Sequence, residues 1–358
     1  MDLRKLGWDD SWQAAFAPFA AEGLLPARVA LEDKHSFRVV GEAGECEATV
    51  PGRMLNLRAS ETNLPKVGDW VAITPPTTAG PSVIRGILPR RTQLARKVAG
   101  RELREQVLVT NIDIAIIVQG LDQSYNLRRL ERFLVMAHEG GLQPVVVLNK
   151  ADCCAQAEAR LSECVACAGT APVLLTSART GQGLAELGRM IPPGKSAVFI
   201  GSSGVGKSSL INRLYGEDIL ATQEVRAHDA KGRHTTTWRE LILLPEGGLV
   251  IDTPGMREFH LWVAGDGLEA AFADVVELAS HCRFRDCRHQ TEEGCAVLAA
   301  VRDQRLSPQR LASYQRLRQE LEYLAAERRT HTFRARGRKF RPTDRRHTDG
   351  RIDWDDSR

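Results

Sequence analysis

The chain has 358 residues, of which 43% are hydrophobic and 26% charged, and its formal net charge is +4. This composition is typical of globular proteins and excludes wholesale disorder and collagen-like repeats. No window reaches the roughly 18 apolar residues of a membrane span, and the N-terminus lacks the apolar core of a secretory signal. We therefore expect a cytoplasmic protein with no membrane partner, whose eight cysteines are reduced thiols or metal ligands rather than a disulfide framework.

Residues 1–27 form an N-terminal extension that matches no motif, and residues 28–90 follow as a series of short β segments. The segments are RVALED, SFRVVGE, ECEATVPG, VGDWVAIT and SVIRGILPR, with glycine and proline turns between them. Five short strands in about 60 residues predict a small β-barrel of the OB-fold kind. Such barrels often bind single-stranded nucleic acid or RNA; the alternative is a barrel that serves packing alone.

Between residues 104 and 262, apolar β patterns alternate with helical patterns. The segment VLVTNIDIAIIVQG predicts one long strand, and LRRLERFLVMAHEGG predicts an amphipathic helix. Further strand runs are PVVVLNK, APVLLTSA, SAVFIG, WRELILLP and GLVIDTPG. Continuous Val, Ile and Leu runs that alternate with helices are typical of a parallel sheet covered on both faces. The region therefore predicts a doubly wound α/β domain.

A phosphate-binding loop lies between the strand SAVFIG and the helix that follows it. Its residues fit the pattern G-x4-G-K-S and are Gly201, Ser202, Ser203, Gly204, Val205, Gly206, Lys207 and Ser208. Glycines let backbone N–H groups curl around phosphates at the positive end of a helix. We expect Lys207 to reach the β- and γ-phosphates, where it assists catalysis, and Ser208 to hold Mg²⁺.

Two short motifs indicate guanine rather than adenine as the base. The first is Asn149-Lys150-Ala151-Asp152, and the second is Thr176-Ser177-Ala178, each at the end of a strand. The Asp152 carboxylate can accept hydrogen bonds from guanine N1–H and its amino group, whereas adenine would leave it unpaired at a cost of roughly 1–3 kcal/mol or more. The second loop presents a backbone N–H to guanine O6 in GTPases. Together the motifs predict a GTP site.

The remaining pieces of a GTPase follow the phosphate loop. Asp252 and Gly255 belong to a D-x-x-G motif, in which the aspartate meets Mg²⁺ through water and the glycine N–H contacts the γ-phosphate. The run Thr235–Thr237 lies where a switch threonine completes the Mg²⁺ shell, and we assign Thr236 to that role. The spacing alone leaves the three threonines open.

One expected catalytic group is missing. The residue after D-x-x-G is often a glutamine that positions the attacking water, but here it is Met256. We therefore expect slow intrinsic hydrolysis that a partner accelerates. His234 is a candidate internal substitute; the alternative is a structural role in the switch loop.

The order of these motifs is rotated. An ordinary GTPase meets its phosphate loop first and its guanine motif later, whereas here the motifs at 149 and 176 precede those at 201, 235 and 252. A parallel sheet tolerates this rotation because the site is assembled from loops at one edge of the strands, whatever their connection. The sequence thus predicts a circularly permuted P-loop GTPase domain.

A cysteine and histidine cluster follows the last predicted strand. Cys282, Cys287, His289 and Cys295 lie within 14 residues, in a loop with almost no apolar residues to hold it folded. Three thiolates and one imidazole match a closed structural zinc site, and free thiols are the alternative. A second group, Cys153, Cys154, Cys164 and Cys167, lies in a predicted helix over 153–169. There we expect packing rather than a second metal.

The end of the chain reads as helices and then a basic tail. One helix is predicted over 267–280, and Ser307-Pro308 opens a long one whose apolar stripe is Leu311, Tyr314, Leu317, Leu321 and Leu324. Residues 327–358 hold eleven Arg and Lys against six Asp and Glu, whereas the rest of the chain is nearly balanced. The tail therefore suits a polyanion, with salt-sensitive binding; a disordered solubilising extension is the alternative.

With these motifs in place, the chain resembles the ribosome small subunit-dependent GTPase A family. The resemblance covers roughly residues 28–330 and depends on NKAD, TSA, GSSGVGKSS, GRHTTT, DTPG and CRFRDCRHQTEEGC in this order. It implies GTP hydrolysis to GDP stimulated by the small (30S) ribosomal subunit, and a role in late maturation of that subunit through its 16S rRNA. It also implies that Ser209 joins the GTP site and that the cysteine and histidine cluster holds one zinc ion.

The predicted architecture is therefore α/β, a circularly permuted P-loop GTPase with an N-terminal OB-fold barrel and a C-terminal helical zinc-binding domain. The expected divisions are residues 1–27, 28–90, 104–262, 263–330 and a basic tail over 331–358. We expect a monomer. Two alternatives remain: a translation- or targeting-type GTPase with a protein partner, and a non-enzymatic RNA-binding assembly factor. Intact Lys207, Ser208 and Asp252 argue against the second.

Overall fold

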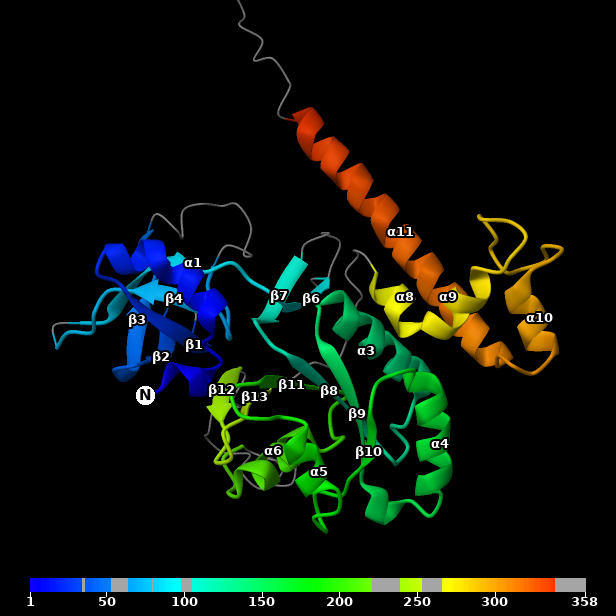
Figure 1. The fold of residues 1–358 in the computed structure, drawn as a ribbon, viewed down its shortest axis with the longest axis horizontal. Helices are drawn as coiled ribbons and strands as arrows, with labels where there is room; N and C mark the ends of the chain where they lie inside the picture. The colour runs from blue at the N-terminus through cyan, green and yellow to red at the C-terminus, as the bar shows by residue number, and fades with distance from the viewer. Residues whose placement is uncertain are drawn as a thin grey trace, which may run out of the picture.

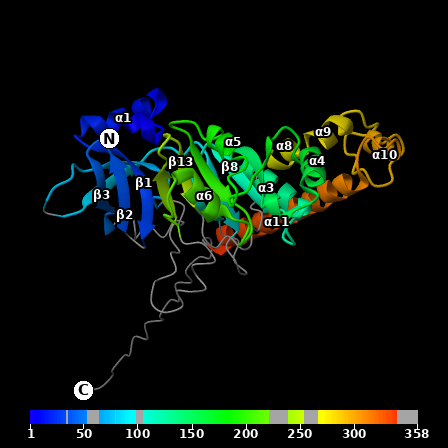
Figure 2. The same ribbon diagram turned by 90° about the horizontal axis from the view of Figure 1, so that it is seen from below.

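The computed structural model describes residues 1–33, 36–52, 64–78, 80–97, 105–220, 239–252 and 266–338. Figure 2 shows three parts in a row: a barrel with the N-terminal helix over it, a central sheet with helices, and a C-terminal group of helices. None of the helices in these ranges combines the length and the apolar character needed to cross a membrane.

The N-terminal part is a closed five-stranded barrel. Its strands are β1 (Leu25–Asp33), β2 (Ser36–Gly41), β3 (Gly44–Thr49), β4 (Trp70–Ile73) and β5 (Ser82–Ile87). They follow the order β1-β2-β3-β5-β4, and β4 pairs back onto β1. The pair β3–β5 is parallel and the others are antiparallel. This arrangement confirms the predicted barrel.

The N-terminal extension packs on this barrel. It contains a short 3₁₀ helix, η1 (Leu3–Leu6), and α1 (Asp10–Ala21), whose first N–H groups are capped by the Asp9 side chain. Trp12 and Phe16 are buried, and the rings of Trp8 and Trp70 meet edge to face with centroids 4.6 Å apart. Burial of these large rings anchors the helix to the barrel.

The central sheet carries the predicted α/β pattern. Its strands are β8 (Ile114–Gly120), β9 (Gln143–Asn149), β10 (Val173–Leu175), β11 (Ser196–Ile200), β12 (Glu240–Leu243) and β13 (Leu249–Asp252). The order is β10-β9-β8-β11-β13-β12, with β12 antiparallel and the rest parallel. The antiparallel edge strand β12 also pairs with β1, at Leu31 and Glu240, which joins the sheet to the barrel.

Helices cover both faces of this sheet, as the continuous apolar runs predicted. The helices are α3 (Leu127–Glu139), α4 (Ala157–Ala168), α5 (Leu184–Arg189) and α6 (Lys207–Tyr215). Ala115 and Ile117 of β8 pack in the cluster that contains residues of α3 and α4, whereas Ile116 and Val118 pack in the cluster that contains residues of α5 and α6. Alternate side chains of one strand therefore serve the two faces.

The prediction of one long strand over VLVTNIDIAIIVQG is wrong. The chain instead forms β7 (Glu105–Thr110), which pairs with β6 (Gln93–Lys97) in a separate ribbon, and then β8. Asn111 lies between them with φ of 52°, a left-handed conformation that asparagine adopts more readily than most residues. The hydrophobic pattern did not indicate this turn, because Thr110 and Asn111 are buried like the apolar residues on either side of them.

The C-terminal part is helical. It contains α8 (Gly267–Ala271), α9 (Ala273–Ala279), α10 (Ala296–Arg302) and the long α11 (Pro308–Arg338), which extends past the rest of the molecule in Figure 1. The single helix predicted over 267–280 is broken at Phe272, whose backbone leaves the helical region while its ring is fully buried beside Tyr314. The apolar stripe of α11 packs in the core, as predicted.

A buried arginine joins the barrel to the central sheet. Arg28 of β1 is 1% exposed, and its guanidinium donates to the carbonyl oxygens of Leu6 and Asn111 and to Ser196 Oγ at the start of β11. Burial lowers the pKa of Arg28 to about 10, so the group remains charged at neutral pH. One side chain thus ties the extension, the barrel and the sheet together.

Replacing Arg28 with methionine should destabilise the protein by at least about 2 kcal/mol, because several buried acceptors lose their donor. Arg38→Met is the matched control. Arg38 also joins barrel and sheet, through Glu240, but its side chain is 39% exposed, so its loss should cost less than about 1 kcal/mol. Denaturant unfolding measures both, and equal losses would contradict the joint role of Arg28.

Candidate functional site

The phosphate loop connects β11 to α6, as predicted. Gly201, Gly204 and Gly206 have φ of 151°, 80° and 99°. A Cβ on Gly201 would lie 2.4 Å from the carbonyl oxygen of Val118 in β8, and one on Gly206 would lie 2.2 Å from Nδ2 of Asn149. Glycine is thus required here both by conformation and by the close approach of neighbouring loops.

The polar side chains at the start of α6 face this loop. Lys207 Nζ donates to the carbonyl oxygens of Gly201 and Ser202, at 3.0 and 2.9 Å. Ser208 Oγ lies 3.3 Å from Oδ2 of Asp252, at the end of the adjacent strand β13. A lysine, a serine hydroxyl and a carboxylate therefore meet at one edge of the sheet, a donor set that suits a phosphate chain with Mg²⁺.

Asn149 links three of the predicted motifs. Its Nδ2 donates to the carbonyl oxygen of Val205 in the phosphate loop at 2.9 Å, and its Oδ1 accepts from the N–H of Ala178 at 3.2 Å and from Thr176 Oγ1 at 3.3 Å. The side chain is 2% exposed. A single buried amide therefore fixes the loops at 149, 176 and 201 relative to one another.

Lys150 and Asp152 of this motif also contact neighbouring loops. Lys150, with φ of 68°, places Nζ 2.7 Å from the carbonyl oxygen of Gly204 and 2.6 Å from Oδ2 of Asp122. Asp152 accepts from Ser177 Oγ at 2.6 Å and pairs with Arg179. The Ser177 hydrogen bond lowers the pKa of Asp152, so its carboxylate is ionised at neutral pH and is an acceptor only.

Some predicted residues lie outside the described part of the chain. These are His234, the Thr235–Thr237 run with Thr236, and Gly255 with Met256 after it. Their roles remain predictions.

Sequence reasoning missed one residue that contacts the phosphate loop. Arg129, in the first turn of α3, donates from Nη1 to Ser202 Oγ. A signal was present, because Arg128 and Arg129 follow the N-cap Asn126 at the end of a helix where a positive charge is unfavourable. Such placement indicates that the arginine has a task other than stabilising its helix.

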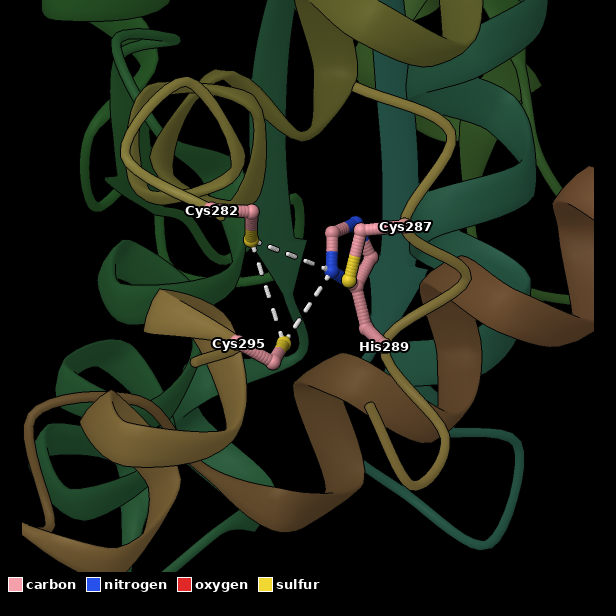
Figure 3. A group of neighbouring side chains, drawn as sticks. All are labelled: Cys282, Cys287, His289 and Cys295. Atoms are coloured by element: carbon pink, nitrogen blue, oxygen red, sulfur yellow. Dashed lines mark hydrogen bonds between the residues drawn. The ribbon is translucent and has the colours of Figure 1, made fainter. Parts of the chain in front are cut away.

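The four predicted metal ligands converge between α9 and α10, as Figure 3 shows. Their ligand atoms all lie within 4.8 Å of one another. Cys282 Sγ and Cys295 Sγ are 3.9 Å apart, and His289 Nδ1 lies 3.7 and 3.4 Å from them. Around an ion with metal–sulfur distances of about 2.3 Å, tetrahedral sulfurs would be about 3.8 Å apart. The cluster therefore fits a four-coordinate metal ion.

The protein also fixes the orientation of these ligands. His289, with φ of 57°, is 3% exposed, and its carbonyl oxygen accepts from Gln315 of α11 at 2.6 Å. Cys295 caps α10, where its Sγ accepts from the N–H of Leu298. The metal cluster is thus built into the junction of three helices.

The second cysteine group does not form one cluster. Cys164 and Cys167 lie on α4 and are buried in the core, where burial raises the pKa of Cys164 to about 12. Cys153 ends a 3₁₀ turn, η3 (Ala151–Cys153), and is exposed. The helix predicted over 153–169 begins only at Ala157.

Comparison with known proteins decides the family. A family model described as RsgA GTPase matches residues 87–262, and one described as 50S ribosome-binding GTPase matches residues 196–331. The chain is 48% identical to the small ribosomal subunit biogenesis GTPase RsgA of Opitutus terrae, over 91% of each chain. The protein of the same name from Syntrophotalea carbinolica is 42% identical, over 98% of this chain and all of its own.

The chain belongs to the RsgA GTPase family. Two solved structures resemble it. YjeQ from Thermotoga maritima has a TM-score of 0.63 and is 27% identical, over 83% of this chain and 98% of its own. YloQ, described as a circularly permuted GTPase, has a TM-score of 0.61 and is 25% identical, over 84% of this chain and 95% of its own. The permuted fold and the GTP-hydrolysing activity predicted from the motif order are thereby confirmed.

Gly206→Ala should abolish tight nucleotide binding, because the new Cβ would clash with the Asn149 amide. Gly216→Ala is the matched control: Gly216 has a similar φ of 92°, but no atom lies within 4 Å of the position that a Cβ would take there. It should cost about 1 kcal/mol in stability and leave binding intact. Titration with a fluorescent GTP analogue measures both, and equal affinities would contradict the close-approach argument.

Proposed function

We propose that this protein is a GTPase that acts in the biogenesis of the small ribosomal subunit, and that the subunit stimulates its hydrolysis of GTP to GDP and phosphate. The observation that carries the nucleotide part is the Asn149 side chain, which holds the phosphate loop and both guanine-type loops together. The partner part is supported by relatives of the same family that span almost the whole chain and are named for that subunit.

The proposed roles of individual residues combine the sequence motifs with the geometry of those residues that the structure describes. Residues 149–152 and 176–178 would hold guanine, with Asp152 as the acceptor for its two donors. Residues 201–209 would surround the phosphates, and Lys207 would leave its present carbonyl partners to reach them. Ser208, Thr236 and Asp252 would hold Mg²⁺, which screens the charge of the phosphates when bound. Gly255 would contact the γ-phosphate.

Hydrolysis needs a group that orients water, and Met256 cannot accept or donate a strong hydrogen bond. We propose that His234 supplies this group when the subunit is bound. Slow turnover of the protein alone and faster turnover with its partner would follow, because the catalytic arrangement would be complete only in the complex.

The metal cluster is proposed to hold one structural zinc ion. Its donors, three sulfurs and one imidazole nitrogen, are those that zinc prefers in closed sites. All four ligand positions come from the protein, which leaves none for substrate. The ion would hold together a loop that has few apolar contacts of its own.

Contacts with 16S rRNA are proposed for the basic tail over 331–358 and for the metal-bearing region. OB-folds usually bind nucleic acid on the face of their second and third strands. In this barrel that face is less suited to RNA, because the exposed side chains of β3 include Glu45 and Glu47 and Arg38 is paired with Glu45.

We also propose that the chain divides into residues 1–27, 28–90, 104–262 and 263–330, that the protein is a monomer, and that it is located in the cytoplasm.

GTP turnover should be slow for the protein alone, rise at least about tenfold with isolated small subunits and stay unchanged with large subunits. The family description that names the 50S subunit makes the large subunit the competing partner. Stimulation by large subunits alone would favour it, and stimulation by neither would overturn the ribosomal proposal. Asp152→Asn is a control for the base: it should weaken GTP binding at least about tenfold without creating ATP binding.

Metal analysis should find one zinc ion per chain, and Cys287→Ser should lower that content. Chelation should unfold the loop between α9 and α10, because the ligands rather than apolar packing hold that loop. Circular dichroism and limited proteolysis measure this loss. Cys164→Ser, a change at a buried cysteine outside the cluster, should leave the zinc content unchanged; full zinc in both variants would contradict the assignment.

A further inference from the structure

The first turn of α3 touches the phosphate loop. Asn126 caps the helix by accepting from the N–H of Arg129 at 3.0 Å, and the Arg129 guanidinium donates to Ser202 Oγ and, at 3.4 Å, to the carbonyl oxygen of Ser124. Arg129 is half-buried. Its fixed, planar donor group therefore holds one side of the loop that would surround the phosphates.

The residues that follow Arg129 in α3 contact α11. Arg132 forms two hydrogen bonds with Glu320, at 2.6 and 2.7 Å, and Glu131 pairs with Arg310 at 3.0 Å. Glu131 and Arg310 are 4% and 7% exposed. Arg310 also binds Asp274 and lies 3.9 Å from the centroid of the Phe272 ring. Because the Glu131–Arg310 pair is buried, it holds α3 and α11 in one defined arrangement.

Residues 129–132 thus contact both the phosphate loop and α11 within about one helical turn, which spans about 5.4 Å. A hydrogen-bonded turn moves as a unit, so a shift of α11 that carries Arg132 and Glu131 also moves Arg129 relative to Ser202. The α11 helix begins beside the metal cluster, where Gln315 donates to the carbonyl oxygen of His289, and its residues 331–338 are the first part of the basic tail.

We propose that residues 129–132 of α3 couple the phosphate loop to α11, with Arg129 as a positioning residue for the nucleotide. The proposal rests on the proposed function in one respect, that residues 201–208 bind phosphate. It implies that GTP affinity depends on an ion pair that touches neither the nucleotide nor the phosphate loop. By linkage, a ligand that binds α11 more tightly in one position of the helix than in another alters GTP affinity, and GTP alters the binding of that ligand by the same factor.

The test is the affinity of the full-length chain for a non-hydrolysable GTP analogue. Glu320→Arg should weaken binding at least about fivefold, which is within the usual range of coupling between sites. A loss of affinity is informative, because the added positive charge by itself would strengthen the binding of an anionic nucleotide. The Arg132→Glu and Glu320→Arg double variant should restore affinity, because it rebuilds the pair with its charges exchanged.

Glu322→Arg is the matched control. It makes the same charge change two residues along α11, where Glu322 pairs with Arg318 of its own helix, and it should leave affinity within about twofold of the original. A second set of variants tests the contact between Arg129 and the phosphate loop. Arg129→Met should weaken binding at least about tenfold, whereas Arg128→Met, at an exposed neighbour, should not. Arg129→Met should also remove the effect of Glu320→Arg.

Equal affinities for the Glu320→Arg and Glu322→Arg variants, or additive losses from Arg129→Met and Glu320→Arg, would overturn the coupling alone. Failure of the unmodified chain to bind the analogue would overturn the proposed function and the coupling with it. A loss that the double variant does not restore would show that Glu320→Arg damages the helix, which also counts against the proposal. Thermal unfolding of each variant identifies such damage.

Discussion

The side-chain amide of Asn149 is the interaction on which the nucleotide site depends. It reaches the phosphate loop through Val205 and the neighbouring loop through Ala178, which lie 56 and 29 positions from Asn149 in the sequence. A buried amide whose donor and acceptor are both used has one favourable orientation, because any other leaves polar atoms unpaired. Gly206 is forced by the same contact, since no side chain fits between it and Asn149.

Around this centre, two buried arginines fix the other parts of the molecule. Arg28 joins the barrel to the start of β11, and Arg310 joins α11 to α3 and α8. The two differ in their partners: Arg28 is surrounded by carbonyl and hydroxyl oxygens, whereas Arg310 faces two carboxylates. Guanidinium groups suit both tasks because their five donors lie in one rigid plane.

The cluster of four potential metal ligands lies in a loop that has little apolar core of its own. The segment between α9 and α10 is rich in charged residues, and Phe284 within it is 46% exposed. Apolar burial therefore contributes little here, whereas four ligand atoms converge within a few ångströms. The adjoining helices are conventional, with Phe272 and Tyr314 packed together in the core. The cysteine and histidine cluster meets the apolar core at His289, whose ring centroid lies 6.3 Å from that of Tyr314.

The sequence by itself determined the chemistry, because short motifs carry their own donors, acceptors and backbone requirements. The phosphate loop, the guanine motif, the four metal ligands and the rotated motif order could all be recognised before any fold was known. The barrel and the layered sheet also followed, since period-two and continuous apolar patterns record how many faces of a strand are buried.

Only the tertiary structure decided how these pieces are joined. The turn at Asn111 and the break at Phe272 lie inside apolar runs, where hydrophobic pattern carries no information about a change of direction. Arg28, Arg129 and Arg310 reach partners that lie 83, 73 and 179 positions away in the sequence. Arginine is common on protein surfaces, so its type and local sequence cannot reveal whether distant oxygens will surround it in the folded chain.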